Sequence, residues 1–394
     1  MKICFDTRSI HPHMAPLASC LKCLLPSDNI VYVYRSTPND PNRAVGAHGL
    51  VDDIAVFWDG LLASEASKHV LESDVLIENH RDFDIMEERG RRGLLTIYQS
   101  ERWFKPIKFL VAIPGFFRIF LPFGIKRAIR MMRLFRSNKK FYYFPLGEHA
   151  ARDMARMCGL MNGDLLCLFR APKIEFENKP CGCIKLHGGD AGKRYCLDRM
   201  RMWGYFVPQK EGDRAEEVVK QSEAENELKI LWVGRMLALK NVDIIIKAVL
   251  DVARQVKEGK NKRRIRLDIY GDGPEESRLK KLAKNNLDII RVYPSVPYSH
   301  VRKIMKEHDV YVFCSNELEG WGAVVNEAIE EGMLVLSSSA AGASVMLPKE
   351  CLFKHNDYRR LSKLLCSSIP RVDKELWTAK SAAGKLKDFI GELS

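Results

Sequence analysis

Short apolar segments alternate with amphipathic ones through the second half of the chain, and this alternation constrains the fold more than any other feature. Strands are expected at 227–235, 265–271, 289–294, 309–315 and 333–339, and helical spacing separates them. Strands that alternate with helices predict a parallel, doubly wound α/β sheet. Ligands bind such sheets beyond the carboxyl ends of the strands. Functional residues are therefore expected at those ends.

The first half of the chain carries a weaker signal of the same kind, with strand-like segments at 2–6, 29–35, 74–79 and 93–99. A chain of 394 residues usually forms two domains rather than one. The polar stretch 208–227 is typical of a linker between them. The sequence thus predicts a Rossmann-like domain over 1–205, a second over 206–373, and a helix over 374–394 that packs back on the first domain.

A formal net charge of +13 predicts an acidic partner. Residues 103–147 contain ten Lys or Arg, no acidic residue and many aromatics. Within them, Ile125, Ile129, Met132 and Phe135 are expected on one helix face. A cationic amphipathic helix with aromatic anchors favours the surface of an anionic membrane. The alternatives are a core-packing helix with a solvated basic face and, third, a nucleic-acid surface, for which no recognisable motif is present.

Eleven cysteines are scattered through the sequence, and its start resembles no signal peptide. Reduced thiols in the cytosol are therefore expected. Cys20 and Cys23 have a zinc-like interval, but no second such pair follows, so buried or inert thiols are favoured over a metal site. No apolar run reaches membrane-spanning length, because Pro114, Arg118 and Pro122 interrupt the nearest candidate.

Four groups of residues lie at predicted strand ends in the second half. Arg235 and Lys240 offer two cations beside a helix start, a suitable setting for a diphosphate. The remaining groups are a tight glycine turn, a strand-terminal serine, and two glutamates separated by seven residues around a Gly-Trp-Gly sequence at an expected helix start. Those residues are Gly234, Gly271, Gly273, Ser315, Glu319, Gly320, Trp321, Gly322 and Glu327. Anion-binding groups beside carboxylates suit a nucleotide-sugar, which carries both phosphates and hydroxyls.

The motifs WVGRMLALKN, IYGDGPEESRLKKLA, EGWGAVVNE and CLFKHNDYRRLSKLL, in this order, resemble those of the retaining GT-B glycosyltransferases. More narrowly, residues 228–365 resemble the family-4 group of bacterial polysaccharide and lipopolysaccharide transferases. The resemblance implies two Rossmann-like domains with parallel sheets facing each other across a cleft. It also implies transfer of a sugar, with retention of configuration, from a nucleotide-diphosphate-sugar.

The resemblance also implies roles for individual residues. Arg235 and Lys240 match the pair that binds the donor diphosphate, and Glu319 matches the glutamate that contacts the transferred sugar. Glu327 matches the glutamate that holds the ribose, and Asn241 stands where the family usually has glycine. Two cations at the leaving group imply chemistry without a metal or other cofactor.

Acceptor residues are less defined. Many relatives have a histidine where this chain has Tyr98, Gln99 and Ser100, and the family's glycine pair near the N-terminus is missing. The acceptor-side candidates are His80, Gln99, Ser100, Glu101 and Arg102. The expected acceptor is lipid-linked or a polysaccharide, as in capsule or lipopolysaccharide synthesis, at the cytoplasmic face of the cell membrane. The alternative is a non-catalytic nucleotide-sugar-binding subunit of an assembly complex.

Overall fold

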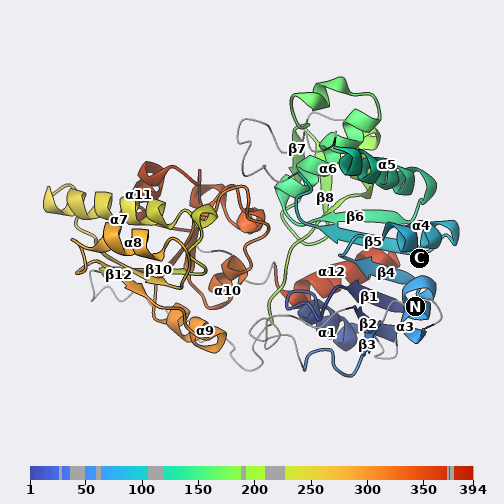
Figure 1. The fold of residues 1–394 in the computed structure, drawn as a ribbon, viewed down its shortest axis with the longest axis horizontal. Helices are drawn as coiled ribbons and strands as arrows, with labels where there is room; N and C mark the ends of the chain where they lie inside the picture. The colour runs from blue at the N-terminus through green and yellow to red at the C-terminus, as the bar shows by residue number, and fades with distance from the viewer. Residues whose placement is uncertain are drawn as a thin grey trace. The chain divides into compact units, whose positions relative to one another are not determined.

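The structure is a computed structural model that describes residues 1–25, 29–35, 49–58, 64–104, 119, 121–187, 192–208, 227–370, 372 and 377–393. The chain divides into two compact units (Figure 1). The first unit contains residues 1–208 and 375–394, and the second contains 209–374. The expected linker at 208–227 lies almost entirely outside the described residues.

A six-stranded parallel sheet forms the centre of the first unit, in the order β3-β2-β1-β4-β5-β6. Its central strands are buried along their whole length, because helices cover both faces. The strand order reverses between β1 and β4, which is where a doubly wound sheet binds ligands. The strands are β1 (Ile3–Thr7), β2 (Ile30–Tyr34), β3 (Ala55–Phe57), β4 (Val75–Glu78), β5 (Leu95–Ser100) and β6 (Phe141–Pro145).

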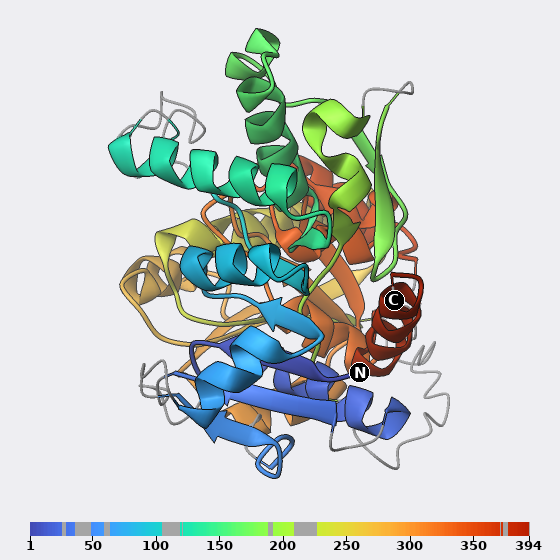
Figure 2. The ribbon, with the colours of Figure 1, turned by 90° about the vertical axis from the view of Figure 1, so that its right-hand side faces the viewer.

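Six helices among the described residues pack around this sheet, with α1 against α12 and α3 against α4. They are α1 (Ala15–Leu24), α3 (Glu65–Glu72), α4 (Phe83–Arg91), α5 (Pro122–Ser137), α6 (Glu148–Met161) and α12 (Ala379–Gly391). Phe389 of α12 contacts the rings of Tyr142 and Phe144 on β6, so the C-terminal helix is part of the first unit's core. Figure 2 shows both ends of the chain on this unit.

A small antiparallel sheet follows α6 and completes the first unit. Its order is β7-β8-β9, and the chain next to β9 forms parallel bridges with β6. Its strands and the short helices beside them are η3 (Leu165–Leu168), β7 (Ile174–Phe176), β8 (Gly182–Leu186), η4 (Gly192–Tyr195), η5 (Leu197–Arg199) and β9 (Arg201–Met202). These elements, together with β3 and β6, were not among the strands expected from the sequence.

The second unit contains another six-stranded parallel sheet, in the order β12-β11-β10-β13-β14-β15. Every strand expected in this half is present. The strands are β10 (Glu227–Val233), β11 (Arg264–Tyr270), β12 (Ile290–Tyr293), β13 (Val310–Phe313), β14 (Leu334–Ser338) and β15 (Leu352–Phe353). Two doubly wound parallel sheets confirm the predicted α/β fold class.

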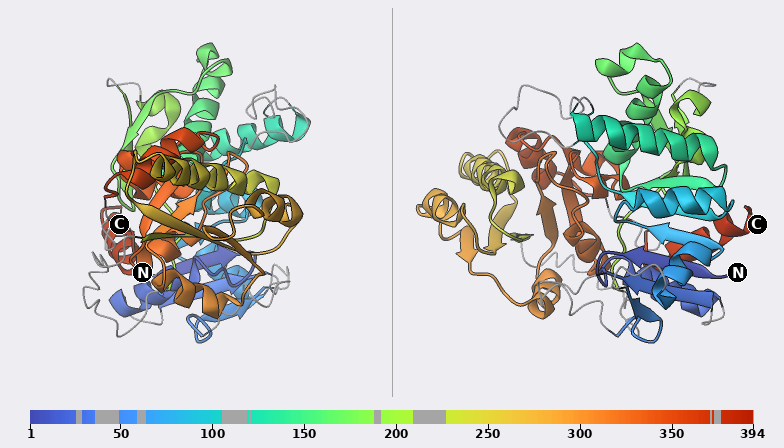
Figure 3. Two further views of the ribbon diagram at one scale, coloured as in Figure 1. Left: turned by 90° about the vertical axis from the view of Figure 1, so that its left-hand side faces the viewer. Right: turned by 45° about the vertical axis from the view of Figure 1, so that its right-hand side comes forward.

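Helix α7 packs against α8 and α11, and α9 packs against α10. Figure 3 shows α7 and α11 side by side over the second sheet. The helices are α7 (Val242–Lys257), α8 (Glu276–Ala283), α9 (Tyr298–Lys306), α10 (Val324–Glu330) and α11 (Tyr358–Cys366), with the short helices η6 (Ala238–Lys240), η7 (Gly342–Met346) and η8 (Lys349–Cys351).

Candidate functional site

The carboxyl ends of β10, β11 and β13 lie side by side in the second unit, because these strands are neighbours in the sheet. Arg235 follows β10, Gly271 follows β11 and Ser315 follows β13. The strand order reverses between β10 and β13, so this edge is the switch point at which such sheets bind ligands. These three predicted donor residues therefore follow neighbouring strands at one edge of one sheet.

Lys240 and Glu319 are in direct contact, with the ammonium of Lys240 paired with the Glu319 carboxylate. The loops that carry them are also joined through their backbones, since the Asn316 amide donates to the Leu239 carbonyl at 2.9 Å. The Cys314 thiol donates to the Lys240 carbonyl, also at 2.9 Å. The structure thus holds together the cation expected to bind a phosphate and the acid expected to contact a sugar.

Asn241, the residue that replaces the family's glycine, has a left-handed backbone with φ of 47°. Asparagine tolerates this conformation better than most residues other than glycine. Its side-chain amide also donates to the Cys314 carbonyl at 3.2 Å. The substitution therefore preserves the turn between η6 and α7.

The glycines after β10 and β11 let two loops pack backbone to backbone. Gly271 has φ of 151°, and a Cβ there would lie 1.9 Å from the Gly234 carbonyl oxygen. A Cβ on Gly273 would lie 2.6 Å from the Met236 carbonyl oxygen. Gly271 and Gly273 each contact the loop that follows β10, and this packing shapes the edge of the sheet. Their direct part in donor binding stays a prediction.

Arg235 is exposed at this edge, and among the described residues no carboxylate forms an ion pair with it. Ser315 is buried, and its carbonyl accepts a hydrogen bond of 2.5 Å from the Ser338 hydroxyl at the end of β14. Of these two residues, Arg235 is the one whose side chain a ligand can reach directly.

The expected helix start at Gly320–Gly322 is wrong, because α10 begins at Val324. Gly320 and Trp321 instead accept hydrogen bonds from the amides of Gly342 and Ala343, which tie the loop to η7. Gly322 has φ of 91°, a value outside the right-handed helical region. Glu327 therefore lies in the first turn of α10 rather than about two turns into a helix.

Trp321 is 1% exposed, and its indole donates to the Asn326 side chain at 2.7 Å. This indole cannot stack on a ligand in the described conformation. It positions the loop that carries Glu319, and any contact of Trp321 with a donor would come from its backbone.

Glu327 is buried and accepts a hydrogen bond of 3.1 Å from the hydroxyl of Tyr298 on α9. Burial raises the pKa of Glu327 to about 7, against the opposing influence of the Arg302 charge and the Tyr298 hydrogen bond. Arg302 itself pairs with Glu331. Sequence reasoning missed Tyr298, although its place just after β12 was a usable signal.

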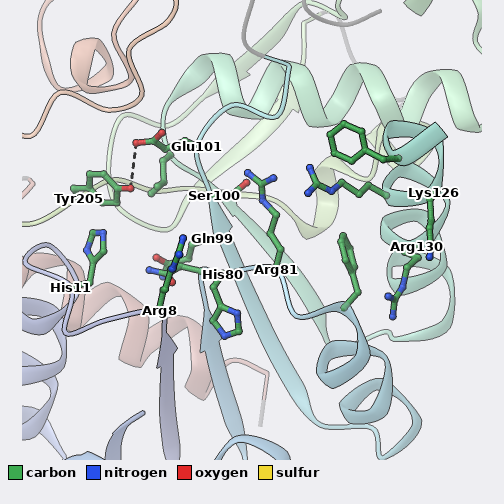
Figure 4. A pocket seen from close by; sticks show the side chains of 15 residues that line it. Arg8, His11, His80, Arg81, Gln99, Ser100, Glu101, Lys126, Arg130 and Tyr205 are labelled. Atoms are coloured by element: carbon green, nitrogen blue, oxygen red, sulfur yellow. Dashed lines mark hydrogen bonds between the residues drawn. The ribbon is translucent and has the colours of Figure 1, made fainter. Parts of the chain in front are cut away.

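A cavity of about 680 Å³ lies at the carboxyl ends of the first unit's sheet (Figure 4). It opens where β1, β4, β5 and β6 end, next to the switch point of that sheet. His80, Gln99, Ser100 and Glu101, four of the five acceptor-side candidates, line it. Its other lining residues are Arg8, His11, Asn79, Arg81, Phe83, Phe123, Lys126, Arg127, Arg130, Leu146 and Tyr205.

His80 lies between two buried carboxylates. Its Nε2 is 3.0 Å from Asp6 Oδ2 and its Nδ1 is 3.6 Å from Glu78 Oε1. Burial acts to lower the pKa of His80, but the Asp6 hydrogen bond and the two negative charges outweigh burial and raise it. Burial also raises the pKa of Glu78 to about 7. The imidazole is therefore held as a cation over a wider pH range than an ordinary histidine.

The remaining acceptor-side candidates differ in what they contact. The Ser100 hydroxyl accepts from the Trp103 indole at 2.9 Å and lies 3.0 Å from the Tyr143 hydroxyl. Glu101 accepts a 3.4 Å hydrogen bond from Tyr205, drawn as a dashed line in Figure 4. Arg102 pairs with Asp153 at 3.1 Å and is not among the residues that line the cavity.

Gln99 is 1% exposed, and neither its amide nitrogen nor its amide oxygen has a hydrogen-bond partner among the described residues. It occupies the region where many relatives are expected to have histidine. A buried amide without partners is costly unless something completes its hydrogen bonds. Since Gln99 lines the cavity, a ligand there is one means of satisfying it.

Several cations around this cavity were missed as site residues. Arg81, at the end of β4, has φ of 74°, and its guanidinium lies 5.7 Å from the Trp103 ring centre. Lys126, Arg127 and Arg130 come from α5. Arg130 pairs with both Asp84 and Glu87, so its charge is balanced. The signal for the three cations of α5 was the run of basic residues without acids at 103–147, whereas Arg81 lies outside that run.

Helix α5 lies within the basic segment 103–147. Residues 105–118 and 120 of this segment lie outside the described residues. The expected single apolar face is wrong, because Met132 and Phe135 are buried in the unit. Ile125 and Ile129 are 42% and 45% exposed and form a row with exposed Leu121 at helical spacing. Within the described part of the chain, no helix combines the length and apolar character needed to cross a bilayer.

Asp82 and Asp84 are separated by a single residue at the start of α4. Here Asp82 caps α4 by accepting from the Ile85 amide at 3.2 Å, and it pairs with Arg35 at 3.1 Å. Asp84 pairs with Arg130. Both carboxylates are thus engaged by the protein itself.

Residues 213–365 match the family model described as "Glycosyl transferases group 1". This region is a glycosyltransferase group 1 domain. It contains Arg235, Lys240, Glu319 and Glu327, all of the donor residues that were expected to act on phosphate, sugar or ribose.

Several curated relatives match parts of the chain. "Uncharacterized glycosyltransferase MJ1069" of Methanocaldococcus jannaschii is 33% identical over 119 residues, which is 30% of this chain and 29% of that protein. "Protein CapJ" of Staphylococcus aureus is 30% identical over 157 residues, or 39% of this chain and 38% of that protein. The chain thus matches well under half the length of these two relatives.

Several solved structures match over the whole chain. The lipopolysaccharide outer core galactosyltransferase WaaB has a TM-score of 0.56 at 12% identity, with all of both chains covered. Anabaena Alr3699/HepE in complex with UDP has a TM-score of 0.55 at 12% identity, covering 100% of this chain and 99% of that one. At this identity the likeness concerns the fold, which is the predicted GT-B fold.

Proposed function

We propose that the protein is a retaining glycosyltransferase of family 4 that transfers a sugar from a nucleotide-diphosphate-sugar to a lipid-linked or polysaccharide acceptor. The observation that carries this proposal is the contact between Lys240 and Glu319 at the switch point of the second unit, beside exposed Arg235. A cation and an acid in contact at such an edge suit a ligand that presents phosphate and hydroxyl groups together.

Donor binding would exchange the partners of Lys240. In the described state Glu319 neutralises the ammonium. A diphosphate with two negative charges competes for Lys240 and Arg235, and the released Glu319 carboxylate then accepts hydrogen bonds from sugar hydroxyls. In this proposal Glu327, which accepts a hydrogen bond from Tyr298, also accepts from ribose hydroxyls. Each residue thereby takes the role that the family resemblance implies.

Departure of the nucleoside diphosphate develops negative charge on its β-phosphate. Arg235 and Lys240 stabilise that charge as the bond from the anomeric carbon to the phosphate oxygen breaks. The acceptor hydroxyl attacks from the same face, and its proton passes to the leaving phosphate, so configuration is retained. Because two fixed cations supply the charge, the proposal includes no metal, and EDTA is expected to leave the rate unchanged.

Nucleoside diphosphate release from a panel of UDP-, GDP- and ADP-sugars tests the proposal. Arg235→Ala is expected to lower the rate by about 100-fold or more, because a transition-state charge loses a partner. Arg264→Ala is the matched control, since Arg264 is an exposed cation at the opposite end of β11. Absence of release and of binding with every donor, or equal losses in both variants, would contradict the proposal.

A second candidate is a non-catalytic nucleotide-sugar-binding subunit of a polysaccharide assembly complex. The presence of Gln99 where many relatives have histidine favours it. This function predicts a calorimetric binding signal for a nucleotide-sugar without hydrolysis or transfer to any acceptor. Release of nucleoside diphosphate that depends on Arg235 would exclude it.

The proposed location is the inner face of the cell membrane, with α5 lying on an anionic surface. The support is the exposed apolar row of α5 together with exposed Lys126 and Arg133 on the same helix. Apolar side chains beside cations suit the boundary between lipid headgroups and acyl chains.

A further inference from the structure

The cavity of the first unit carries an excess of positive charge. Arg8, Arg81, Lys126, Arg127 and Arg130 line it, and Glu101 is the one carboxylate among the lining residues that the structure describes. These cations come from three places in the chain, namely the ends of β1 and β4 and the first turns of α5. Folding therefore gathers like charges that the sequence keeps apart.

Three of these cations have no balancing acid within the part of the chain that the structure describes. Among the described residues, no carboxylate forms an ion pair with Arg81, Lys126 or Arg127, whereas Arg130 has two. Burial lowers the pKa of Arg127, and the nearby charge of Arg81 lowers it further. Two guanidiniums that repel each other across a cavity are stabilised when an anion lies between them.

A second observation points to a ligand in the same place. Gln99 lines the cavity with its amide buried and without partners among the described residues. An amide nitrogen can donate to an anion's oxygen, while the amide oxygen can accept from a sugar hydroxyl beside it. His80 also lines the cavity, and both of its ring nitrogens face the carboxylates of Asp6 and Glu78. Figure 4 shows Arg81, Gln99 and His80 around its centre.

We infer that this cavity binds a phosphate-bearing group of the acceptor, through Arg81, Lys126 and Arg127, with Gln99 bonded to the same group or to the sugar next to it. The inference rests on the proposed function, and it narrows the acceptor to a phosphorylated molecule. Guanidinium groups suit this anion because their paired N–H groups match two phosphate oxygens.

Calorimetry with three probes tests the inference: glycerol 3-phosphate, octyl phosphate and the uncharged octyl glucoside. The full chain carries Arg235→Ala and Lys240→Ala, so that the proposed diphosphate site does not bind the probes. We expect both phosphates to bind and octyl glucoside not to bind. Adding Arg81→Gln, Lys126→Gln and Arg127→Gln together should weaken phosphate binding about tenfold or more.

Lys139→Gln is the matched control, because Lys139 is an exposed cation just beyond the far end of α5. Tighter binding of octyl phosphate than of glycerol 3-phosphate supports a lipid source for the anion, and equal binding supports a soluble one. The inference is overturned if the triple variant loses no more affinity than Lys139→Gln, or if octyl glucoside binds as tightly as octyl phosphate.

The triple variant also separates this inference from the proposed function. In a chain with Arg235 and Lys240 intact, the three substitutions should leave the UDP-induced rise in melting temperature unchanged. If UDP does not raise the melting temperature of the unmodified chain, the result counts against the donor site alone. If the phosphate probes bind equally well with and without the three cavity cations, the result counts against the acceptor inference alone.

Discussion

A single buried carboxyl, Glu327, links proton binding to the stability of the second unit. Its pKa is raised to about 7 by burial, against 4.5 for an ordinary glutamate. Between these pH values the folded state holds the extra proton, so stability falls as pH rises from about 4.5 to 7. The shift corresponds to about 3 kcal/mol across that window.

Glu327→Gln should therefore flatten this part of the stability profile. The measurement is the free energy of unfolding by urea at pH 5 and pH 8 for both proteins. The matched control is Glu307→Gln, since Glu307 is exposed at the end of α9. An unchanged slope in Glu327→Gln, or an equal change in both variants, would show that Glu327 does not titrate in this range.

A substitution at Gly271 tests the contact between the two loops that follow β10 and β11 at the proposed donor edge. Gly271→Ala should cost more than about 2 kcal/mol, because the new methyl would lie 1.9 Å from the Gly234 carbonyl in a left-handed backbone. Gly384→Ala is the control, as a Cβ at that position on α12 meets nothing within 4 Å. Similar midpoints of urea unfolding for the two variants would contradict this account.

The strands of the second unit other than β15 were predictable, because each is a short segment with apolar or alternating residues that a turn bounds. The helix containing Glu327 was placed too early, since the contacts of Gly320 and Trp321 with η7 are not local in sequence. In the first unit, the pairing of Arg102 with Asp153 could not be read from the chain for the same reason. Four residues of the cavity could be predicted from the sequence, because each lies at or just after the end of a strand: His80, Gln99, Ser100 and Glu101.

Helix α5 divides its apolar residues between the core and solvent. The exposed row Leu121, Ile125 and Ile129 should insert into the headgroup region of an anionic bilayer. Ile125→Ser with Ile129→Ser should lower the fraction of protein that floats with vesicles of anionic phospholipid, by about tenfold in partition coefficient, because two large apolar side chains are lost. The folded state should be little affected, since both residues are already exposed.

The matched control for this helix is Leu287→Ser, a residue that is 62% exposed in the second unit. Raising the salt concentration should also weaken flotation, because Lys126 and Arg133 contribute through screened charge. Equal flotation of the Ile125–Ile129 variant and the unmodified protein would show that α5 does not contact the membrane.

At the scale of the whole molecule, the first unit is built from two separate parts of the chain, and the second from one continuous part. The C-terminal helix α12 follows the second unit in sequence but packs on α1 and β6 of the first. Phe389→Ala should destabilise the first unit by about 3–5 kcal/mol, because a buried ring is removed from a packed core. UDP should still stabilise the second unit, and exposed Lys385→Ala serves as the control.

Differential scanning calorimetry separates these contributions if the two units unfold in distinct transitions, one of which UDP shifts upward. Phe389→Ala should lower the midpoint temperature of the other transition, which belongs to the first unit. A lowered UDP-sensitive transition with the other unchanged would contradict the assignment of α12 to the first unit.

The return of α12 has a consequence for what happens when the backbone is cut. A single cleavage between residues 208 and 227 makes two polypeptides, yet the second still ends in a helix that is built into the first. The halves should remain associated after such a nick and separate only on unfolding. Conversely, a fragment that stops at residue 208 leaves the α12-facing side of α1 bare, so it should be less soluble than the same fragment supplied with 375–394 as a separate peptide.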